Sequence, residues 1–116
     1  WWERCVKSYV IFSVFGDVLQ ELSDRHQVFS EVFNVWDLGQ GAWVVKNLGP
    51  LTDQDDQLAA RLSLWARRVA GETFGLARAT LFTYPELAVD PETADAIIES
   101  ATRRYRERLQ EVNLKP

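Results

Sequence analysis

Apolar side chains recur along the first third of the chain at spacings that alternate between three and four residues. The series is Phe12, Phe15, Leu19, Leu22, His26, Phe29, Phe33 and Trp36. This spacing places the whole series on one side of an α-helix, whereas a half-buried strand would alternate every second residue. The pattern predicts one helix over about 3–38 whose apolar stripe faces the interior.

A second apolar series predicts another helix over about 53–83. Its members are Leu58, Leu62, Trp65, Val69, Phe74, Ala77 and Leu81. Thr52 is the expected N-cap, and Pro85 ends the helix because the residue before a proline avoids the α conformation. Between the two long helices we expect a short helix over about 42–48, closed by Gly49 and Pro50.

The last predicted helix covers about 91–112. Asp90 is the expected N-cap and Pro91 occupies the first helical position, where the missing N–H of proline costs nothing. The apolar face consists of Ala94, Ile97, Ile98, Ala101, Tyr105, Leu109 and Val112. The fold class is therefore all-α, an antiparallel bundle of three to five helices in a single domain over 1–116.

The lengths of the predicted helices leave two architectures open. At 1.5 Å per residue the helix over 3–38 would span ~54 Å, whereas a compact chain of this size is only ~35 Å across. Breaks at Ser23-Asp24 and Gly71 would give a compact bundle. Unbroken helices would give an elongated bundle whose exposed stripe a second copy or a partner helix covers. The stripe keeps its phase across Ser23-Asp24, which favours the elongated form.

The overall composition narrows the classes of partner and compartment. The chain has five Trp, one Cys, no Met and a net charge of −4. An acidic chain argues against a nucleic-acid partner, and a single cysteine excludes an internal disulfide and suits the cytoplasm. Because the sequence does not begin with Met, we expect a fragment of a longer chain. Trp1-Trp2 with Arg4 and Lys7 leaves an alternative open, a domain tethered to a membrane and facing the cytoplasm.

No combination of residues indicates a catalytic, metal or cofactor site, so we expect a protein that is not an enzyme. His26 is the only histidine, and Cys5 lies 21 residues away from it. A di-iron bundle needs Glu-x-x-His on two helices, but Ser23 stands three residues before His26. His26 is interpreted as a polar residue within the apolar stripe, with a pH-dependent switch as the alternative. The basic run over 103–108 lies among glutamates and is interpreted as a solvated helix face.

Two functional hypotheses remain. The first is an interaction module that self-associates or docks on a protein through an aromatic-rich face that includes Phe29, Phe33 and Trp36. The second is a regulatory domain with a ligand pocket between helices. Its aromatic lining would be Trp36, Trp43, Trp65, Phe74 and Phe82. The small residues Gly71, Gly75 and Ala79 would leave space for the ligand. Arg67, Arg68 or Arg78 would bind an anionic group of that ligand.

Overall fold

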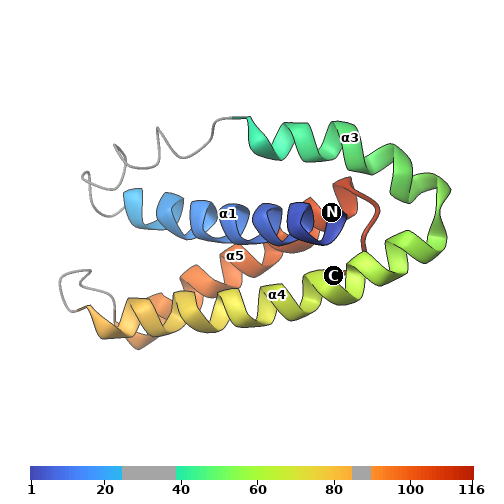
Figure 1. The fold of residues 1–116 in the computed structure, drawn as a ribbon. Helices are drawn as coiled ribbons and strands as arrows, with labels where there is room; N and C mark the ends of the chain where they lie inside the picture. The colour runs from blue at the N-terminus through green and yellow to red at the C-terminus, as the bar shows by residue number, and fades with distance from the viewer. Residues whose placement is uncertain (25–38, 85–89) are drawn as a thin grey trace.

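The computed structural model describes residues 1–24, 39–84 and 90–116, and these residues form four α-helices without any strand. The helices are α1 (Trp2–Ser23), α3 (Gln40–Gln54), α4 (Asp56–Thr83) and α5 (Pro91–Glu111). Figure 1 shows α3 antiparallel to α1, and α5 antiparallel to α4. The predicted all-α bundle is thus confirmed. Within the described ranges, no helix combines the length and apolar character needed to cross a bilayer.

The bundle is elongated, with principal extents of 45 × 24 × 20 Å. Helix α1 packs against α4, α5 and α3, and α4 likewise packs against the three other described helices. Helix α4 runs without interruption for 28 residues through Gly71, so the candidate break at this glycine does not occur. The long second helix of the sequence analysis is confirmed as a continuous element.

Helix α1 is shorter than predicted, because it ends at Ser23 and Asp24 follows as its C-cap. The Ser23 hydroxyl donates to the carbonyl of Gln20 at 2.7 Å, a local hydrogen bond at the last turn. The single continuous helix over 3–38 is therefore wrong, and the candidate break at Ser23-Asp24 is where this helix stops. The predicted residues His26, Phe29, Phe33 and Trp36 lie outside the described residues.

The buried face of α1 also differs from the predicted one. Val6, Val10 and Val14 are fully buried, whereas Phe12 is 45% exposed and Phe15 is only half-buried. Periodicity finds an apolar arc but does not say where its centre points. Because α4 and α5 both pack against α1, the arc that faces them forms the core, and these three valines, which were not in the predicted stripe, occupy its centre.

Two capping predictions have opposite outcomes. Asp90 caps α5 as expected, since its carboxylate accepts a hydrogen bond from the Thr93 N–H at 2.7 Å. Thr52 does not cap α4, because α3 continues past Gly49 and Pro50 to Gln54. Pro50 is exposed, so the carbonyl that loses its helical donor can be solvated.

Asp55 is the residue that caps α4, and it accepts from the Leu58 N–H at 3.0 Å. Thr52 is buried, and its hydroxyl donates to the Val112 carbonyl at 2.6 Å. Thr52 therefore joins α3 to the end of α5. No pattern of neighbouring residues in the sequence predicts this contact.

The interior is divided into two apolar clusters along the bundle. One lies around the first half of α1 and includes the fully buried Leu48, Leu62 and Leu109. The other joins the end of α1 to the end of α4 and the start of α5, through Val18, Leu81 and Ile97. This division leaves one polar stretch on α1 between the clusters, at Asp17.

Candidate functional site

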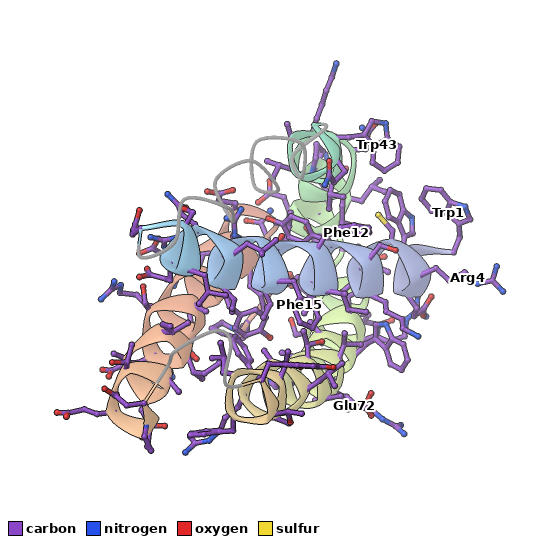
Figure 2. All side chains as sticks on the ribbon, turned by 90° about the vertical axis from the view of Figure 1, so that its left-hand side faces the viewer. Trp1, Arg4, Phe12, Phe15, Trp43 and Glu72 are labelled. Carbon is purple, nitrogen blue, oxygen red and sulfur yellow. The ribbon has the colours of Figure 1, made fainter. Side chains whose placement is uncertain are left out.

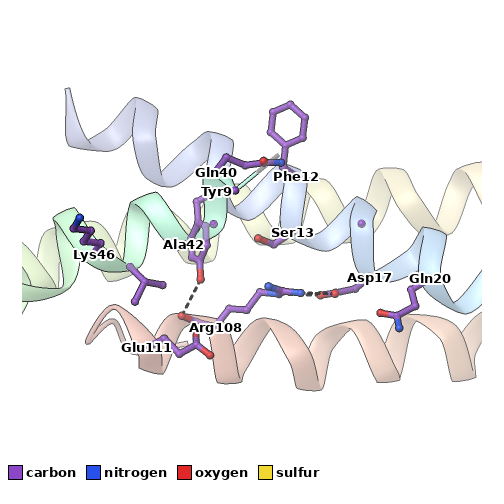
Figure 3. Close-up of a pocket in the computed structure, with 14 residues that line it drawn as sticks. Tyr9, Phe12, Ser13, Asp17, Gln20, Gln40, Ala42, Lys46, Arg108 and Glu111 are labelled. Atoms are coloured by element: carbon purple, nitrogen blue, oxygen red, sulfur yellow. Dashed lines mark hydrogen bonds and ion pairs between the residues drawn. The ribbon is translucent and has the colours of Figure 1, made fainter. Parts of the chain in front are cut away.

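Asp17 and Arg108 form the main polar contact of the interior, between α1 and α5 (Figure 3). Asp17 is 2% exposed, and Arg108 donates to its two carboxylate oxygens at 3.2 Å from Nε and 2.7 Å from Nη2. These hydrogen bonds from Arg108 to Asp17 raise the pKa of the guanidinium. The pair is internally neutral, and both oxygens of the carboxylate are occupied.

A second arginine extends this contact into a network. Arg104 donates to the side-chain oxygen of Gln20 at 2.9 Å and lies 3.4 Å from a carboxylate oxygen of Glu21. Ser100 also donates to Glu21, at 2.8 Å. Every polar group of the network thus has a partner on the facing helix, which indicates that the network holds α1 to α5.

A hollow of about 560 Å³ lies beside this network, between α1, α3 and α5. Tyr9, Ser13, Lys46, Arg108 and Glu111 line it (Figure 3). The Tyr9 hydroxyl donates to the Arg108 carbonyl at 3.3 Å, and burial raises the pKa of Tyr9 to about 12. Tyr9 and Arg108 are thus bound within the protein, as part of the polar lining of this hollow.

A second hollow, of about 530 Å³, follows the outer side of the seam between α1 and α3. Its described lining is largely apolar and consists of Cys5, Ser8, Tyr9, Phe12, Gly39, Gln40, Trp43 and Val44. Gly41 fits against Tyr9, whose Cε1 would lie 3.8 Å from an added Cβ. Gly39, just before α3, has a φ of +88°, a conformation that favours glycine. We call this hollow the α1–α3 groove.

Large aromatic side chains stand at the edge of the α1–α3 groove. Trp1 is 74% exposed, Trp43 is 48% exposed, and their ring centroids are 6.1 Å apart. Figure 2 shows both at the same end of the seam, with Phe12 further along α1. We call Trp1, Phe12 and Trp43 the aromatic face.

Three basic residues lie exposed on the surfaces of α1 and α3. Arg4 and Lys7 on α1 and Lys46 on α3 are exposed. None of them forms an ion pair with another described residue. The neighbouring acid Glu3 is paired with Arg61 at 3.4 Å.

The residues predicted to line a pocket are distributed over the bundle. Of these, Trp43 lines the α1–α3 groove. Trp65 donates from its indole N–H to the Glu3 carbonyl at 2.8 Å, which ties α4 to α1. Phe74 packs edge-on against Tyr105 at 5.7 Å between ring centroids, as a core contact. Trp36 lies outside the described residues.

The predicted arginines and glycines of α4 are also spread apart. Arg67 donates to the Pro116 carbonyl at 3.2 Å, and Arg68 lies 3.9 Å from Glu72 on its own helix. Gly71 and Gly75 are exposed, and no atom lies within 4 Å of a Cβ added at either one. Further along α4, Arg78 pairs with Asp95 at 2.7 Å and lies over the ring of Phe82. None of these residues shares a hollow with Trp43.

Sequence reasoning missed the residues that form the floor of the α1–α3 groove. Cys5, Ser8 and Phe12 follow one another at spacings of three and four, which is a helix face, but only Phe12 belonged to the predicted stripe. A mixed Cys, Ser and Phe face carries no periodic apolar signal. The available signal was the clustering of Trp and basic residues at the start of the chain.

The described residues contain no group of three or more His, Cys, Asp or Glu side chains placed to hold a metal ion. The thiol of Cys5 is half-buried, and burial raises its pKa, which disfavours the reactive thiolate. The chemistry of this region is that of a largely apolar groove.

Comparison with known protein families gives one finding. The family model described as "Ferritin-like domain, actinomycetes" matches residues 1–97. No curated protein and no solved structure matches the chain.

Proposed function

The chain belongs to the family of ferritin-like domains of actinomycetes, and we propose that it acts there as a non-catalytic interaction module. In this proposal the module docks on a protein partner through the aromatic face. The observation that carries the proposal is the exposure of Trp1, Phe12 and Trp43 around an apolar groove. Contiguous exposed apolar surface of this kind marks sites of association.

A di-iron centre does not fit the residues of this bundle. Such centres take a Glu from each of two helices and a Glu-x-x-His pair from each of the other two. The sequence has one histidine, so two such pairs cannot be assembled. The one buried carboxylate of the described interior, Asp17, is already bound through both oxygens by Arg108. The proposal therefore assigns no metal and no metal-dependent step.

The gain in apolar burial supports docking at the aromatic face. A Trp side chain buries 150–250 Å² when enclosed, and burial is worth ~25 cal/mol per Å². Covering the exposed parts would therefore contribute on the order of 3–5 kcal/mol for Trp1 and on the order of 2–3 kcal/mol for Trp43. Aromatic anchors beside a hollow are also typical of the residues that dominate interfaces.

A position-specific photo-crosslinking experiment tests the proposal. A photoreactive amino acid replaces Ser8, in the α1–α3 groove, or Arg103, which is exposed on α5. In an actinomycete host, we expect a cross-link from position 8 to one defined segment of a partner, and none from position 103. Trp43→Ala should reduce the yield from position 8. Equal cross-linking from both positions, or none from position 8, would contradict the proposal.

The alternative of a ligand-binding regulatory domain is supported by the size of the hollow beside Asp17. Its volume of about 560 Å³ is within the range of small-molecule sites. However, Arg108 and Tyr9 are hydrogen-bonded within the protein, which leaves fewer groups to select a ligand. Docking at the aromatic face would not compete with these hydrogen bonds, and we therefore prefer it.

A further inference from the structure

The segment that follows α5 reverses direction and returns into the core. Helix α5 ends near Asn113, which has a left-handed backbone with a φ of +59°. The Leu114 N–H then donates to the Leu109 carbonyl at 2.9 Å, the hydrogen-bond pattern of a Schellman motif. This reversal buries Leu114, which is 2% exposed, in the same apolar cluster as Leu109. We call residues 112–116 the tail.

Two hydrogen bonds join the tail to the buried side of α3. The Thr52 hydroxyl donates to the Val112 carbonyl at 2.6 Å. The side-chain amide of Asn113 donates to the Gly49 carbonyl at 2.9 Å. Gly49 and Thr52 are two of the four residues that α3 buries. The tail therefore provides a large share of the contacts that hold α3 in the bundle.

The tail is also bound to α4, toward which it runs in Figure 1. The Ser63 hydroxyl on α4 accepts a hydrogen bond from the Lys115 N–H at 2.9 Å. Helix α3 packs on α1 and on α4 but has no extended contact with α5. Because the tail continues from α5, it supplies a connection between α5 and α3 that the packing of these two helices does not provide.

The backbone at the two ends of α3 would allow the helix to move as one unit. A single extended residue, Asp55, separates α3 from α4, with a φ of −127° and a ψ of 95°. At the other end Gly39 precedes the helix, with a φ of +88°. Residues at the ends of helices commonly serve as hinges, because they absorb changes in φ and ψ.

We infer that the tail is a latch for α3. With the tail bound, α3 is held on the bundle; when the tail detaches, α3 opens as a unit while α1, α4 and α5 stay packed. These three helices pack on one another, and the second apolar cluster, around Val18, Leu81 and Ile97, contains no residue of α3. Because Trp43 lies on α3, the latch also controls the position of the aromatic face. The inference thus adds a mode of regulation to the proposed function.

Hydrogen exchange of the whole chain, followed by mass spectrometry under native conditions, tests the latch. Thr52→Val keeps the shape of the side chain and removes the bond to the Val112 carbonyl. Asn113→Gly keeps the left-handed turn and removes the side-chain bond to the Gly49 carbonyl. Each variant should speed exchange of the α3 amides by about threefold to tenfold, the effect of one lost hydrogen bond.

Ile97→Val is the control that separates local opening from complete unfolding. Ile97 is buried in the second apolar cluster, away from α3. Its substitution lowers the free energy of complete unfolding, so it should speed the slowest amides of α4 and α5 and leave the α3 amides unchanged. If Ile97→Val accelerated α3 as much as α4 and α5, α3 would open only when the whole bundle unfolds, and the latch would be overturned.

Ser63→Ala shows whether the tail detaches together with α3. The Ser63 hydroxyl bonds to the tail and to the Ala59 carbonyl of its own helix, and it has no hydrogen bond to α3. If the tail is the latch, Ser63→Ala should speed exchange of the α3 amides by a factor similar to that of Thr52→Val. Unchanged α3 exchange in Ser63→Ala would show that α3 opens while the tail stays on α4, which contradicts the latch.

The latch and the docking proposal can fail separately. The exchange experiment uses the chain without a partner, so a negative result there overturns the latch and leaves the cross-link from position 8 to decide the docking proposal. Absence of that cross-link overturns docking and leaves the exchange result to decide the latch.

Discussion

Arg108 of α5 holds Asp17 of α1 by two hydrogen bonds, of 3.2 and 2.7 Å, across 91 residues of sequence. The Asp17 carboxylate lies between the two apolar clusters of the core and is almost entirely buried. The pair therefore neutralises a charge that the interior could not otherwise contain, and it fixes the position of α5 along α1.

Arg108→Met should destabilise the protein by up to about 3–5 kcal/mol, because the buried Asp17 carboxylate loses both of its hydrogen bonds and keeps only the longer 3.8 Å ion pair with Arg104. Urea unfolding followed by circular dichroism measures the change. The double variant Asp17→Leu with Arg108→Met should be markedly more stable than Arg108→Met alone, because no buried charge remains. A cost below ~1 kcal/mol for Arg108→Met would show that Asp17 is solvated.

The stability of the protein should fall between pH 10 and about pH 12 because of Tyr9. Burial raises the pKa of Tyr9 from 10 in the unfolded chain to about 12 in the folded protein. The folded state then holds a proton that the unfolded state has lost, so the stabilisation present below pH 10 is lost as the pH rises toward 12. The loss should reach roughly 2–3 kcal/mol.

Urea titrations at a series of alkaline pH values test this effect. Tyr9→Phe removes the titrating group, so its stability should decline less over the same interval. It also removes the 3.3 Å hydrogen bond to the Arg108 carbonyl, a long bond whose loss costs about 1 kcal/mol or less at neutral pH. Identical alkaline declines in the two proteins would contradict a buried Tyr9 hydroxyl.

Tyr105→Phe should leave the protein equally stable or raise its stability by up to about 1 kcal/mol. The hydroxyl oxygen of Tyr105 is buried and has no hydrogen-bond partner among the described residues, while its ring packs edge-on against Phe74. The substitution removes the unsatisfied group and keeps the ring. Differential scanning calorimetry should show an unchanged or higher Tm, and a clear decrease would mean that the hydroxyl has a partner.

The two candidate caps of α4 should respond differently to substitution. Asp55→Ala should cost about 1 kcal/mol, the usual loss for an N-cap. Thr52→Asp would be harmless at an N-cap, but Thr52 is buried and donates to the Val112 carbonyl. The introduced carboxylate should therefore destabilise the protein by several kcal/mol. If Thr52→Asp left the free energy of unfolding in urea unchanged, this would support the prediction that Thr52 is the N-cap.

Gly71→Ala and Gly75→Ala should each stabilise the protein by up to about 1 kcal/mol. Both glycines are exposed inside α4 with open space where a Cβ would lie, and alanine is the better helix former. Thermal unfolding of each variant measures the gain. A decrease in stability or a change in sedimentation would indicate that another backbone packs on this strip, as the sequence analysis allowed.

Local sequence signals determined the kind of fold and several of its boundaries. The apolar periodicity of 53–83 and 91–112 predicted α4 and α5, and Asp90 predicted the cap of α5. These signals act over a few residues: the 3.6-residue period, the dipole of the first turn and the conformational restriction before Pro85. The absence of catalytic and metal motifs predicted a protein that is not an enzyme, and the proposed function keeps this expectation.

Tertiary packing decided what the local signals left open. The choice of Val10 and Val14 over Phe12 as the interior of α1 follows from the positions of α4 and α5, which a single helix does not encode. The roles of Thr52 and Arg108 likewise depend on partners 60 and 91 residues away. A sequence specifies which faces of its helices are apolar through nearest-neighbour chemistry, but the sharing of those faces among several helices is a property of the assembled bundle.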